Sequence, residues 1–185
     1  MKIVYSLPHP ADQLESSQAG HTVRARAILS ALERRGHEII RVQAAAGQQS
    51  QAAVSTYRSI VKKLLPRPIA MRLRDTARVA YSRRYAGRLI EALQQHRPDV
   101  ILETHIAFTL AGKIASAETG IPLVLDDVAP PWEEEEQYGV GSRKLARQTY
   151  QEITHQARML VAVSGAIRRL LIAEGLSLIH ISEPT

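Results

Sequence analysis

The sequence predicts an α/β protein built on a doubly wound parallel sheet. Two observations support this fold class. Short apolar runs that suit buried parallel strands recur along the chain, and stretches with apolar residues at helical spacing alternate with them. Because parallel strands need long crossover connections, this alternation favours a single sheet covered by helices.

The first forty-three residues indicate a strand–helix–strand unit. Residues 3–5 are the expected first strand, and a polar loop leads from them to Gly20. Helical spacing then begins at Val23 and ends at Gly36, which suits the C′ position of a helix, and residues 38–42 form the second strand. The helix is expected to bury Val23, Ala27, Ile28, Ala31 and Leu32 and to leave Arg24, Arg26, Glu33 and Arg34 in solvent.

The rest of the chain continues the alternation. After a flexible connection over 44–56, helices are expected at 57–65, 69–96, 108–118, 142–157 and 166–174, and strands at 100–103, 121–125 and 159–163. Ser142 and Ser164 suit N-cap positions, and Gly120 and Gly175 suit helix ends. In the long helix the predicted inner residues are Leu73, Ala77, Ala80, Leu89 and Leu93.

Composition sets the broad class. A chain of 185 residues with 45% hydrophobic residues suits one globular domain, assigned to residues 1–175. The chain has no cysteine, which fits a reducing compartment, and residues 3–7 are too short for the apolar part of a signal peptide. We therefore expect a cytoplasmic domain that can associate with the inner face of a membrane.

Charge is unevenly distributed. Residues 58–88 hold ten Lys or Arg and one acid, Asp75, so the net charge of this segment is +9. The whole chain has a net charge of +6, so the remaining residues together carry −3. A charge this local, with apolar residues among it, points to an anionic membrane surface as partner. Nucleic acid is not expected, since only Tyr81 and Tyr85 interleave the cations. The predicted membrane-surface residues are Arg58, Lys62, Lys63, Arg67, Arg72 and Arg74.

The last ten residues, 176–185, match codon by codon the translation of a transposon-end sequencing adapter. We expect this tail to be non-native and to pack against nothing, and the natural reading frame to continue past Gly175.

Polar residues gather where the predicted strands end. In an open α/β sheet, ligands bind outside the carboxyl ends of the strands. Each residue there also has a purely structural explanation: Gly20 could ease a turn, Asp126 could end a strand and Ser164 could cap a helix. The candidate binding residues are Gly20, His21, Thr22, Thr104, His105, Asp126, Asp127 and Ser164.

Several chemistries find no support in the sequence. His21 and His105 have no third ligand at a spacing that fixes a metal, so we expect no metal site. The nucleophile elbow, the P-loop and the dinucleotide-binding glycine motif are all absent. No cofactor is expected.

The order of motifs resembles family 4 glycosyltransferases, over essentially all of residues 1–175. The resemblance implies the amino-terminal, acceptor-side domain, a Rossmann-like half of the two-domain GT-B architecture. It also implies that the backbone of Gly20 approaches donor phosphates and acceptor. Many members place a histidine near the end of the strand matching 123–125, where this chain has Asp126-Asp127-Val128. The matching segments are Gly20-His21-Thr22-Val23-Arg24, residues 32–38, Arg97-Pro98-Asp99-Val100-Ile101, Gly120-Ile121-Pro122-Leu123-Val124 and Val161-Ala162-Val163-Ser164.

The resemblance implies a retaining hexosyltransferase that moves a sugar from a nucleotide-sugar donor to a glycan or lipid-linked acceptor. The carboxyl-terminal domain, which grips most of the donor in that family, is missing, so this chain alone is expected to be inactive and the catalytic residues stay unknown. Two alternatives remain open. One is a GT-B-type sugar-nucleotide epimerase, and the other is a basic membrane-binding module without catalysis.

Overall fold

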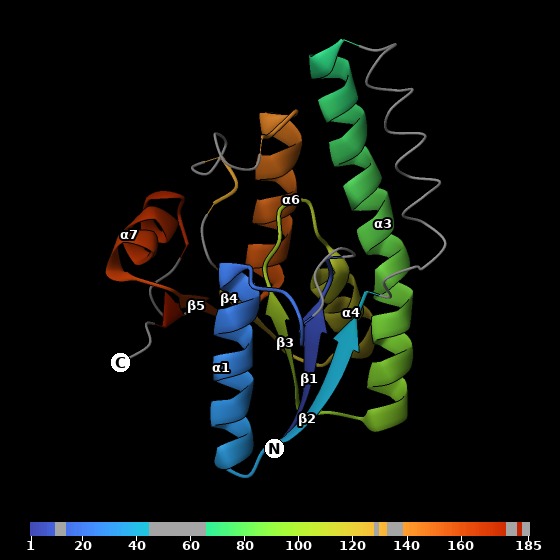
Figure 1. Cartoon of the computed structure of the whole chain (residues 1–185), viewed down its shortest axis with the longest axis vertical. Coiled ribbons are helices and arrows are strands. Elements are labelled where there is room, and N and C mark those ends of the chain that lie inside the picture. Colours follow the sequence, from blue (N-terminus) through green and yellow to red (C-terminus); the bar gives the residue numbers. More distant parts are fainter. Residues whose placement is uncertain (10–13, 45–65, 128–129, 133–138, 177–180, 183–185) are drawn as a thin grey trace.

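The computed structural model describes residues 1–9, 14–44, 66–127, 130–132, 139–176 and 181–182. Within them the chain forms one parallel sheet with the strand order β2-β1-β3-β4-β5-β6 (Figure 1). The predicted fold class is confirmed. The strands are β1 (Lys2–Leu7), β2 (Glu38–Gln43), β3 (Val100–Thr104), β4 (Leu123–Asp127), β5 (Met159–Ala162) and β6 (Ile181–Ser182).

Helices cover both faces of the sheet. One apolar cluster joins α1 to the faces of β1 and β3, and a larger cluster joins α3, α4, α6 and α7 to the opposite face. The start of α3 extends beyond the sheet at the top of Figure 1. The helices are α1 (Gly20–Arg34), α3 (Arg67–His96), α4 (Ala111–Thr119), α6 (Arg143–Gln156) and α7 (Gly165–Ala173).

Local sequence explains where the helices begin and end. Ser142 caps α6 by accepting the Leu145 N–H at 3.3 Å, and Ser164 caps α7 through the Ile167 N–H at 3.3 Å. Gly36, Gly120 and Gly175 follow α1, α4 and α7 with positive φ. Glycine adopts that conformation without the strain that a Cβ brings, so these predicted caps and stops are confirmed.

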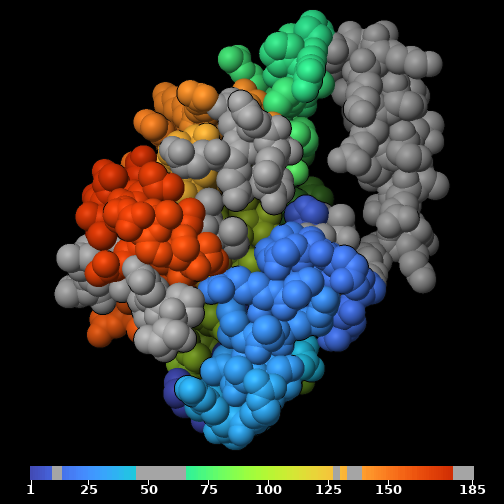
Figure 2. Space-filling view, turned by 60° about the vertical axis from the view of Figure 1, so that its left-hand side comes forward, coloured from blue at the N-terminus to red at the C-terminus, as the bar shows by residue number. Residues whose placement is uncertain are grey.

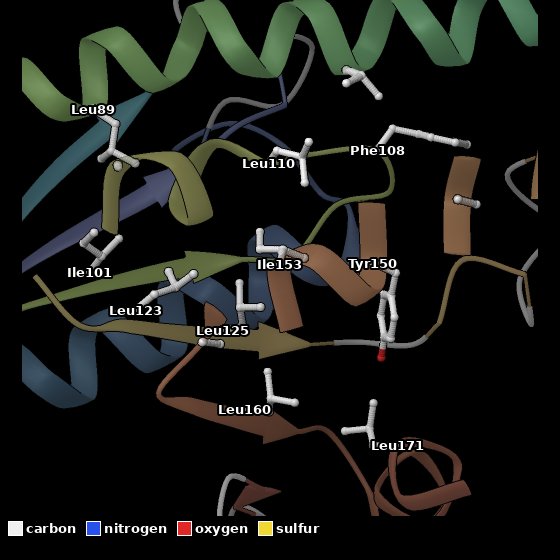
Figure 3. Close-up of a cluster of buried hydrophobic side chains, with 14 of the residues drawn as sticks. Leu89, Ile101, Phe108, Leu110, Leu123, Leu125, Tyr150, Ile153, Leu160 and Leu171 are labelled. Carbon is white, nitrogen blue, oxygen red and sulfur yellow. The ribbon is translucent and has the colours of Figure 1, made fainter. Parts of the chain in front are cut away.

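The larger core lies between the sheet and helices α3, α4 and α6. Figure 3 shows its side chains meeting from both layers, with Leu89 above the strands and Ile153 and Tyr150 arriving from α6. Ile101, Leu123, Leu125 and Leu160 project from three neighbouring strands and are fully buried. Burial of such side chains contributes about 1.5–3 kcal/mol each, so this layer fixes the strand order that positions the site.

Two predicted helix faces are partly wrong. Helix α1 begins at Gly20, and it turns Thr22, Ala25 and Leu29 toward the sheet while Val23 is 45% exposed. Ile28 and Leu32 do pack against that core, as expected. In α3, Leu89 and Leu93 are buried, but Leu73, Ala77 and Ala80 are exposed. The inner face of α3 instead holds two polar residues, Asp75 and Ser82.

The described residues of the tail contact the domain, so the prediction that the tail packs against nothing is wrong. Leu176 is partly buried against the larger core, and Ile181 pairs with Leu160 in the parallel β6–β5 ladder. The edge of β5 offers unpaired backbone groups, which an adjacent extended segment can satisfy whatever its origin. Assignment of residues 176–185 to an adapter stays a prediction. The predicted connection over 44–56, the helix at 57–65 and the cations Arg58, Lys62 and Lys63 lie outside the described residues, Ala44 excepted.

Candidate functional site

The candidate residues share the carboxyl edge of the sheet, as the topology requires. Thr104 pairs with Asp126 in the register of β3 and β4, and the N–H of His105 donates to the Asp126 carbonyl at 3.0 Å. Gly20 opens the helix that follows β1, and Ser164 precedes the helix that follows β5. Figure 2 shows α1 (blue), α7 (red-orange) and the start of α3 (green) on one side of the molecule.

The first turn of α1 suits an anionic ligand. Ala19 at the N-cap has no side-chain hydrogen bond to offer, and the first turn contains no acidic residue. Gly20 is exposed, and a Cβ added there would meet nothing within 4 Å. The positive end of the helix dipole and the open glycine backbone therefore remain available to phosphate oxygens.

His21 and Thr22 differ in their surroundings. His21 is half-buried on the first turn of α1. Thr22 is fully buried, and its hydroxyl donates to the carbonyls of Ser17 and Ala19, at 3.1 and 2.7 Å. Thr22 thus holds the loop against the start of α1.

Asp126 is bound by Arg24, a residue expected in solvent. Arg24 Nε lies 3.0 and 3.1 Å from the two Asp126 carboxylate oxygens, and its Nη2 lies 2.8 Å from Oδ1. The Asp126 side chain is 3% exposed and that of Arg24 is 26% exposed. This bidentate pair joins α1 to the end of β4, so Asp126 does more than end a strand. Arg26, also expected in solvent, donates to the carbonyls of Leu14 and Ser17.

His105 belongs to a chain of aromatic rings. Its ring is buried and lies edge-on to Tyr150, with 5.2 Å between centroids. Tyr150 in turn lies edge-on to Trp132 at 5.1 Å, and the Arg147 guanidinium carbon lies 5.1 Å from the Trp132 ring centre. The rings connect the end of β3 with α6, and they fix the His105 side chain by packing.

Glu103 is a completely buried carboxyl group at the end of β3. The Ser6 hydroxyl donates to its Oε2 at 2.7 Å, and no described residue offers Oε1 a hydrogen bond. Burial raises the pKa of Glu103 from 4.5 to about 7, although the Ser6 hydrogen bond and the backbone N–H of Gly112 favour the ionised form. Tyr85 extends the network, since its hydroxyl lies 3.3 Å from Ser6 Oγ and donates to the Val42 carbonyl at 2.7 Å.

On the opposite face of the sheet, Tyr5 and Thr104 form a second buried polar pair. The Tyr5 hydroxyl lies 2.9 Å from Thr104 Oγ1. Burial raises the pKa of Tyr5 from 10 to about 12. Together the two networks rigidify the ends of β1 and β3 beneath the candidate site.

The remaining candidates lie at the ends of β4 and β5 and at the start of α3. Asp127 is the last residue of β4, and Ser164 is exposed and engaged as the cap of α7. Of the predicted membrane-surface cations, Arg67 and Arg72 are exposed. Arg74 is instead half-buried, and it binds the carboxylate of Asp75 at 2.7 Å and the carbonyl of Gly139.

Sequence reasoning missed the partners that hold the edge together: Arg24, Tyr5, Ser6, Tyr85 and Glu103. One signal was present for Glu103, an acid that interrupts an apolar strand just before Thr104. Within the described ranges, no group of three His, Asp or Glu side chains is placed to hold a metal ion. Nor does any helix in those ranges have the length and apolarity to cross a bilayer.

Comparisons with solved structures show where this fold recurs. The chain is similar to the UDP-GlcNAc 2-epimerase of Neisseria meningitidis bound to UDP-GlcNAc, with a TM-score of 0.58, 11% identity and coverage of 98% of this chain and 45% of that one. It is similar to the lipopolysaccharide outer core galactosyltransferase WaaB in its apo form (TM-score 0.57, 15% identity, 98% and 44%). MurG of Acinetobacter baumannii gives a TM-score of 0.50, 11% identity, and coverage of 100% and 44%.

These likenesses establish the fold, a Rossmann-like domain of the GT-B type, and the chain spans less than half the length of each of the three structures. Among curated protein sequences, none matches the chain. The family model described as Glycosyltransferase Family 4, however, matches residues 19–182. This range includes the candidate residues from Gly20 to Ser164. The chain therefore belongs to Glycosyltransferase Family 4.

Proposed function

We propose that the chain is the amino-terminal half of a retaining glycosyltransferase that uses a nucleotide-sugar donor and a glycan or lipid-linked acceptor. The family match over residues 19–182 carries this proposal. The geometry supports it, because Gly20 offers an open helix start at the carboxyl edge of a parallel sheet. A donor diphosphate there would be stabilised by backbone N–H groups and the helix dipole as negative charge develops on the leaving group.

Chemistry would take place against a second domain. The chain spans 43–47% of the length of the first similar structures. A protein built like them would therefore have a second part of comparable size. We therefore propose that residues 1–175 alone do not transfer sugar.

A sugar-nucleotide epimerase is the second candidate. Several similar structures are UDP-N-acetylglucosamine 2-epimerases, including one from Rickettsia bellii (TM-score 0.56, 14% identity, coverage of 99% of this chain and 44% of that one). The two functions leave different products. A transferase releases one nucleoside diphosphate for each sugar moved to an acceptor, whereas an epimerase inverts a carbon of the sugar and keeps the nucleotide attached.

Product analysis with the complete, uninterrupted protein tests the proposal. The protein is incubated with a panel of UDP- and GDP-sugars, with and without a mixture of glycan and lipid-phosphate acceptors, and nucleotides are separated by chromatography. We expect nucleoside diphosphate to accumulate only when an acceptor is present. An epimeric nucleotide sugar formed without acceptor would replace this function by the epimerase. Turnover by residues 1–175 alone would refute the two-domain proposal.

A membrane surface is the proposed location of the acceptor. In the first turns of α3, Ile69 is 47% exposed and Leu73 is 55% exposed, next to the exposed cations Arg67 and Arg72. Figure 1 shows this end of α3 extending beyond the sheet. Apolar side chains between cations suit the boundary between lipid headgroups and acyl chains.

A further inference from the structure

The completely buried carboxyl group of Glu103 lies directly against the start of α4. An added Cβ at Gly112, in the first turn of α4, would lie 3.0 Å from the Glu103 carboxyl carbon and from Oε2. The Gly112 N–H also donates a hydrogen bond to this carboxyl group. The side chain therefore packs on the helix start, where a residue with a Cβ would crowd it.

The start of α4 depends on partners from other elements. Leu110, at the N-cap, offers no side-chain hydrogen bond, and Ala111 and Gly112 are buried. The Leu110 N–H donates to Ser82 Oγ of α3 at 3.1 Å, and the Gly112 N–H donates to Glu103 of β3. Because buried N–H groups at a helix start need acceptors, Ser82 and Glu103 together replace the missing local cap.

The connection between β3 and α4, residues 105–110, adopts a strained conformation. Phe108 has a φ of 70°, in the left-handed region that bulky residues rarely adopt, and its ring is buried in the larger core. Figure 3 shows Phe108 and Leu110 on this connection. Such a conformation persists only where the surrounding contacts enforce it. The connection should therefore relax when its anchor at the start of α4 loosens.

This connection carries a candidate residue of the site. His105 is its first residue, and its N–H donates to the Asp126 carbonyl at the end of β4, at 3.0 Å. Ile106 and Ala107 follow and are half-buried. Glu103 directly precedes this segment in β3 and contacts α4 just beyond its far end. One side chain thus joins the two ends of the connection at the carboxyl edge.

The protonation state of Glu103 affects this contact. Oε2 accepts the Ser6 hydroxyl at 2.7 Å, whereas Oε1 has no hydrogen-bond partner among the described residues. A buried carboxylate with an unpaired oxygen is costly, and the neutral acid avoids the charge. Burial accordingly raises the pKa of Glu103 from 4.5 to about 7. Because contact with water restores the ordinary pKa, an opening that hydrates Glu103 becomes easier as the pH rises from 4.5 to about 7.

The groups around Glu103 decide which controls are needed. Burial raises the pKa of both neighbouring tyrosines above the ordinary 10, so neither changes charge between pH 4.5 and 7. On α4, Lys113 is bound to Glu152 of α6, and on β4 the residue paired with Glu103 is Leu125. Histidine commonly changes charge near neutral pH, so His105 needs its own control. Among the described residues, the ionisable groups that interact with Glu103 are Tyr5 of β1, Tyr85 of α3 and His105.

We propose that Glu103 is a positioning residue for the carboxyl edge. As a neutral acid it holds the start of α4 and the 105–110 connection in place, and its ionisation favours their local opening without unfolding of the whole domain. The importance of this connection for sugar transfer rests on the proposed function, whereas its control by Glu103 does not.

Amide hydrogen exchange, followed residue by residue by NMR in the 185-residue chain, tests the proposal. The amides of Leu110 and Gly112 should exchange through a local opening, and so more readily than the Ile101 amide inside the sheet. After correction for the intrinsic exchange rate at each pH, their protection should fall at least about tenfold between pH 5 and pH 7. Protection equal to that of Ile101 at every pH would mean that only global unfolding exposes them, and would overturn the proposal.

Glu103→Gln separates protonation from packing, because the amide keeps the shape and the neutrality of the protonated acid. In this variant the protection of the two amides should not change between pH 5 and pH 7. His105→Gln removes the neighbouring histidine, and Glu118→Gln removes an exposed carboxyl group near the other end of α4. Both variants should keep the fall. A fall that persists in Glu103→Gln, or that vanishes in His105→Gln, would overturn the proposal.

The carboxyl carbon resonance of Glu103 in the natural chain gives a check that needs no variant. Its titration midpoint should match the pH at which the protection levels off, at about 7. A midpoint near 4.5, the ordinary value for glutamate, would also overturn the proposal. Neither measurement involves turnover, so loss of the proposed function would leave this result standing, and failure here would leave the proposed function standing.

Discussion

Arg24 and Asp126 form a bidentate ion pair, at 2.8–3.1 Å, between the first helix and the end of the fourth strand. The two residues are 102 positions apart in the chain. Because Asp126 is buried, its carboxylate is shielded from water, and the Arg24 guanidinium compensates its negative charge. The pair also fixes the start of α1, and with it Gly20, relative to the strand ends.

Replacing Arg24 should therefore destabilise the protein. Arg24→Gln leaves the Asp126 carboxylate buried without its partner, and loss of one member of a buried pair costs about 3–5 kcal/mol. Since the Arg24 side chain is partly exposed, water can compensate in part, and we expect about 2–3 kcal/mol. The free energy of unfolding in urea measures the change.

Arg41→Gln is the matched control. Arg41 also pairs with an acid, Glu33 at 2.6 Å, but both side chains are about 40% exposed. Such surface pairs contribute about 0.2–1 kcal/mol. If Arg24→Gln cost no more than Arg41→Gln, the proposed role of the Arg24–Asp126 pair in holding the edge would be wrong.

Glu103 should make stability depend on pH. Burial raises its pKa from 4.5 to about 7, so the folded protein holds this proton more tightly than the unfolded chain does. The contribution is therefore full below pH 4.5 and is lost as the pH rises to about 7. Over that window we expect stability to fall by about 3 kcal/mol from this residue.

Glu103→Gln isolates this effect, since the amide keeps the shape of the side chain but does not titrate. Urea unfolding is measured at several pH values between 4 and 8 in the natural chain and in the variant, and the difference between the two curves gives the contribution of Glu103. Glu91→Gln removes a carboxyl group from the exposed side of α3 and should change little. Parallel curves for the natural chain and Glu103→Gln would contradict the argument.

The fold could be predicted from the sequence because its signals are local. Apolar runs mark the strands, and the caps at Ser142 and Ser164 mark two helix starts. The face of a helix is harder to predict, since it depends on where the helix begins and on what it meets. Helix α3 turns Asp75 toward the protein because the carboxylate accepts the N–H groups of Gly141 and Ser142, at 2.7 and 3.1 Å, from a distant loop.

The candidate site divides in the same way. Topology alone places Gly20, His105 and Asp126 at one edge, because parallel strands end together. The contacts that arrange these residues are long-range pairs, such as Arg24 with Asp126 and Ser6 with Glu103. The spacing of apolar residues in the sequence does not indicate which partner a side chain contacts a hundred residues away. These pairs can therefore be identified only in the folded structure.

Gly141 should tolerate no side chain, because the loop before α6 passes close to α3. A Cβ at Gly141 would lie 2.5 Å from the carbonyl carbon of Met71 and 2.7 Å from the Arg72 nitrogen, and backbone atoms cannot move aside cheaply. We expect Gly141→Ala to destabilise the protein by about 2–3 kcal/mol, as measured by urea unfolding.

Gly87→Ala serves as the opposite control. Gly87 lies inside α3 with nothing within 4 Å of an added Cβ. Alanine there should stabilise the protein by about 0.5–1 kcal/mol, since glycine is a poor helix former. Equal effects of the two substitutions would show that the close approach of the loop to α3 is not real.

The start of α3 should bind anionic vesicles. We expect co-sedimentation with vesicles containing phosphatidylglycerol at low salt, and loss of binding at high salt or with neutral lipid. Arg67→Gln combined with Arg72→Gln should weaken binding about thirtyfold, at about 1 kcal/mol per cation. Arg83→Gln combined with Arg84→Gln makes the same change at exposed positions farther along α3 and should have little effect. Equal binding to neutral and anionic vesicles would show that the start of α3 is not an anionic-membrane-binding surface.

The central claim is that the carboxyl edge at Gly20 is where the nucleotide sugar binds. Gly20→Val in the complete enzyme tests it most directly, because Gly20 is exposed and an added Cβ there meets nothing within 4 Å in the described protein. We therefore expect the fold to tolerate the substitution. The side chain would instead displace the donor phosphates, and a misplacement of about 1 Å costs about a hundredfold in rate. We predict a loss of turnover of at least about a hundredfold with an unchanged unfolding midpoint. Turnover equal to that of the natural enzyme would contradict the assignment of the site.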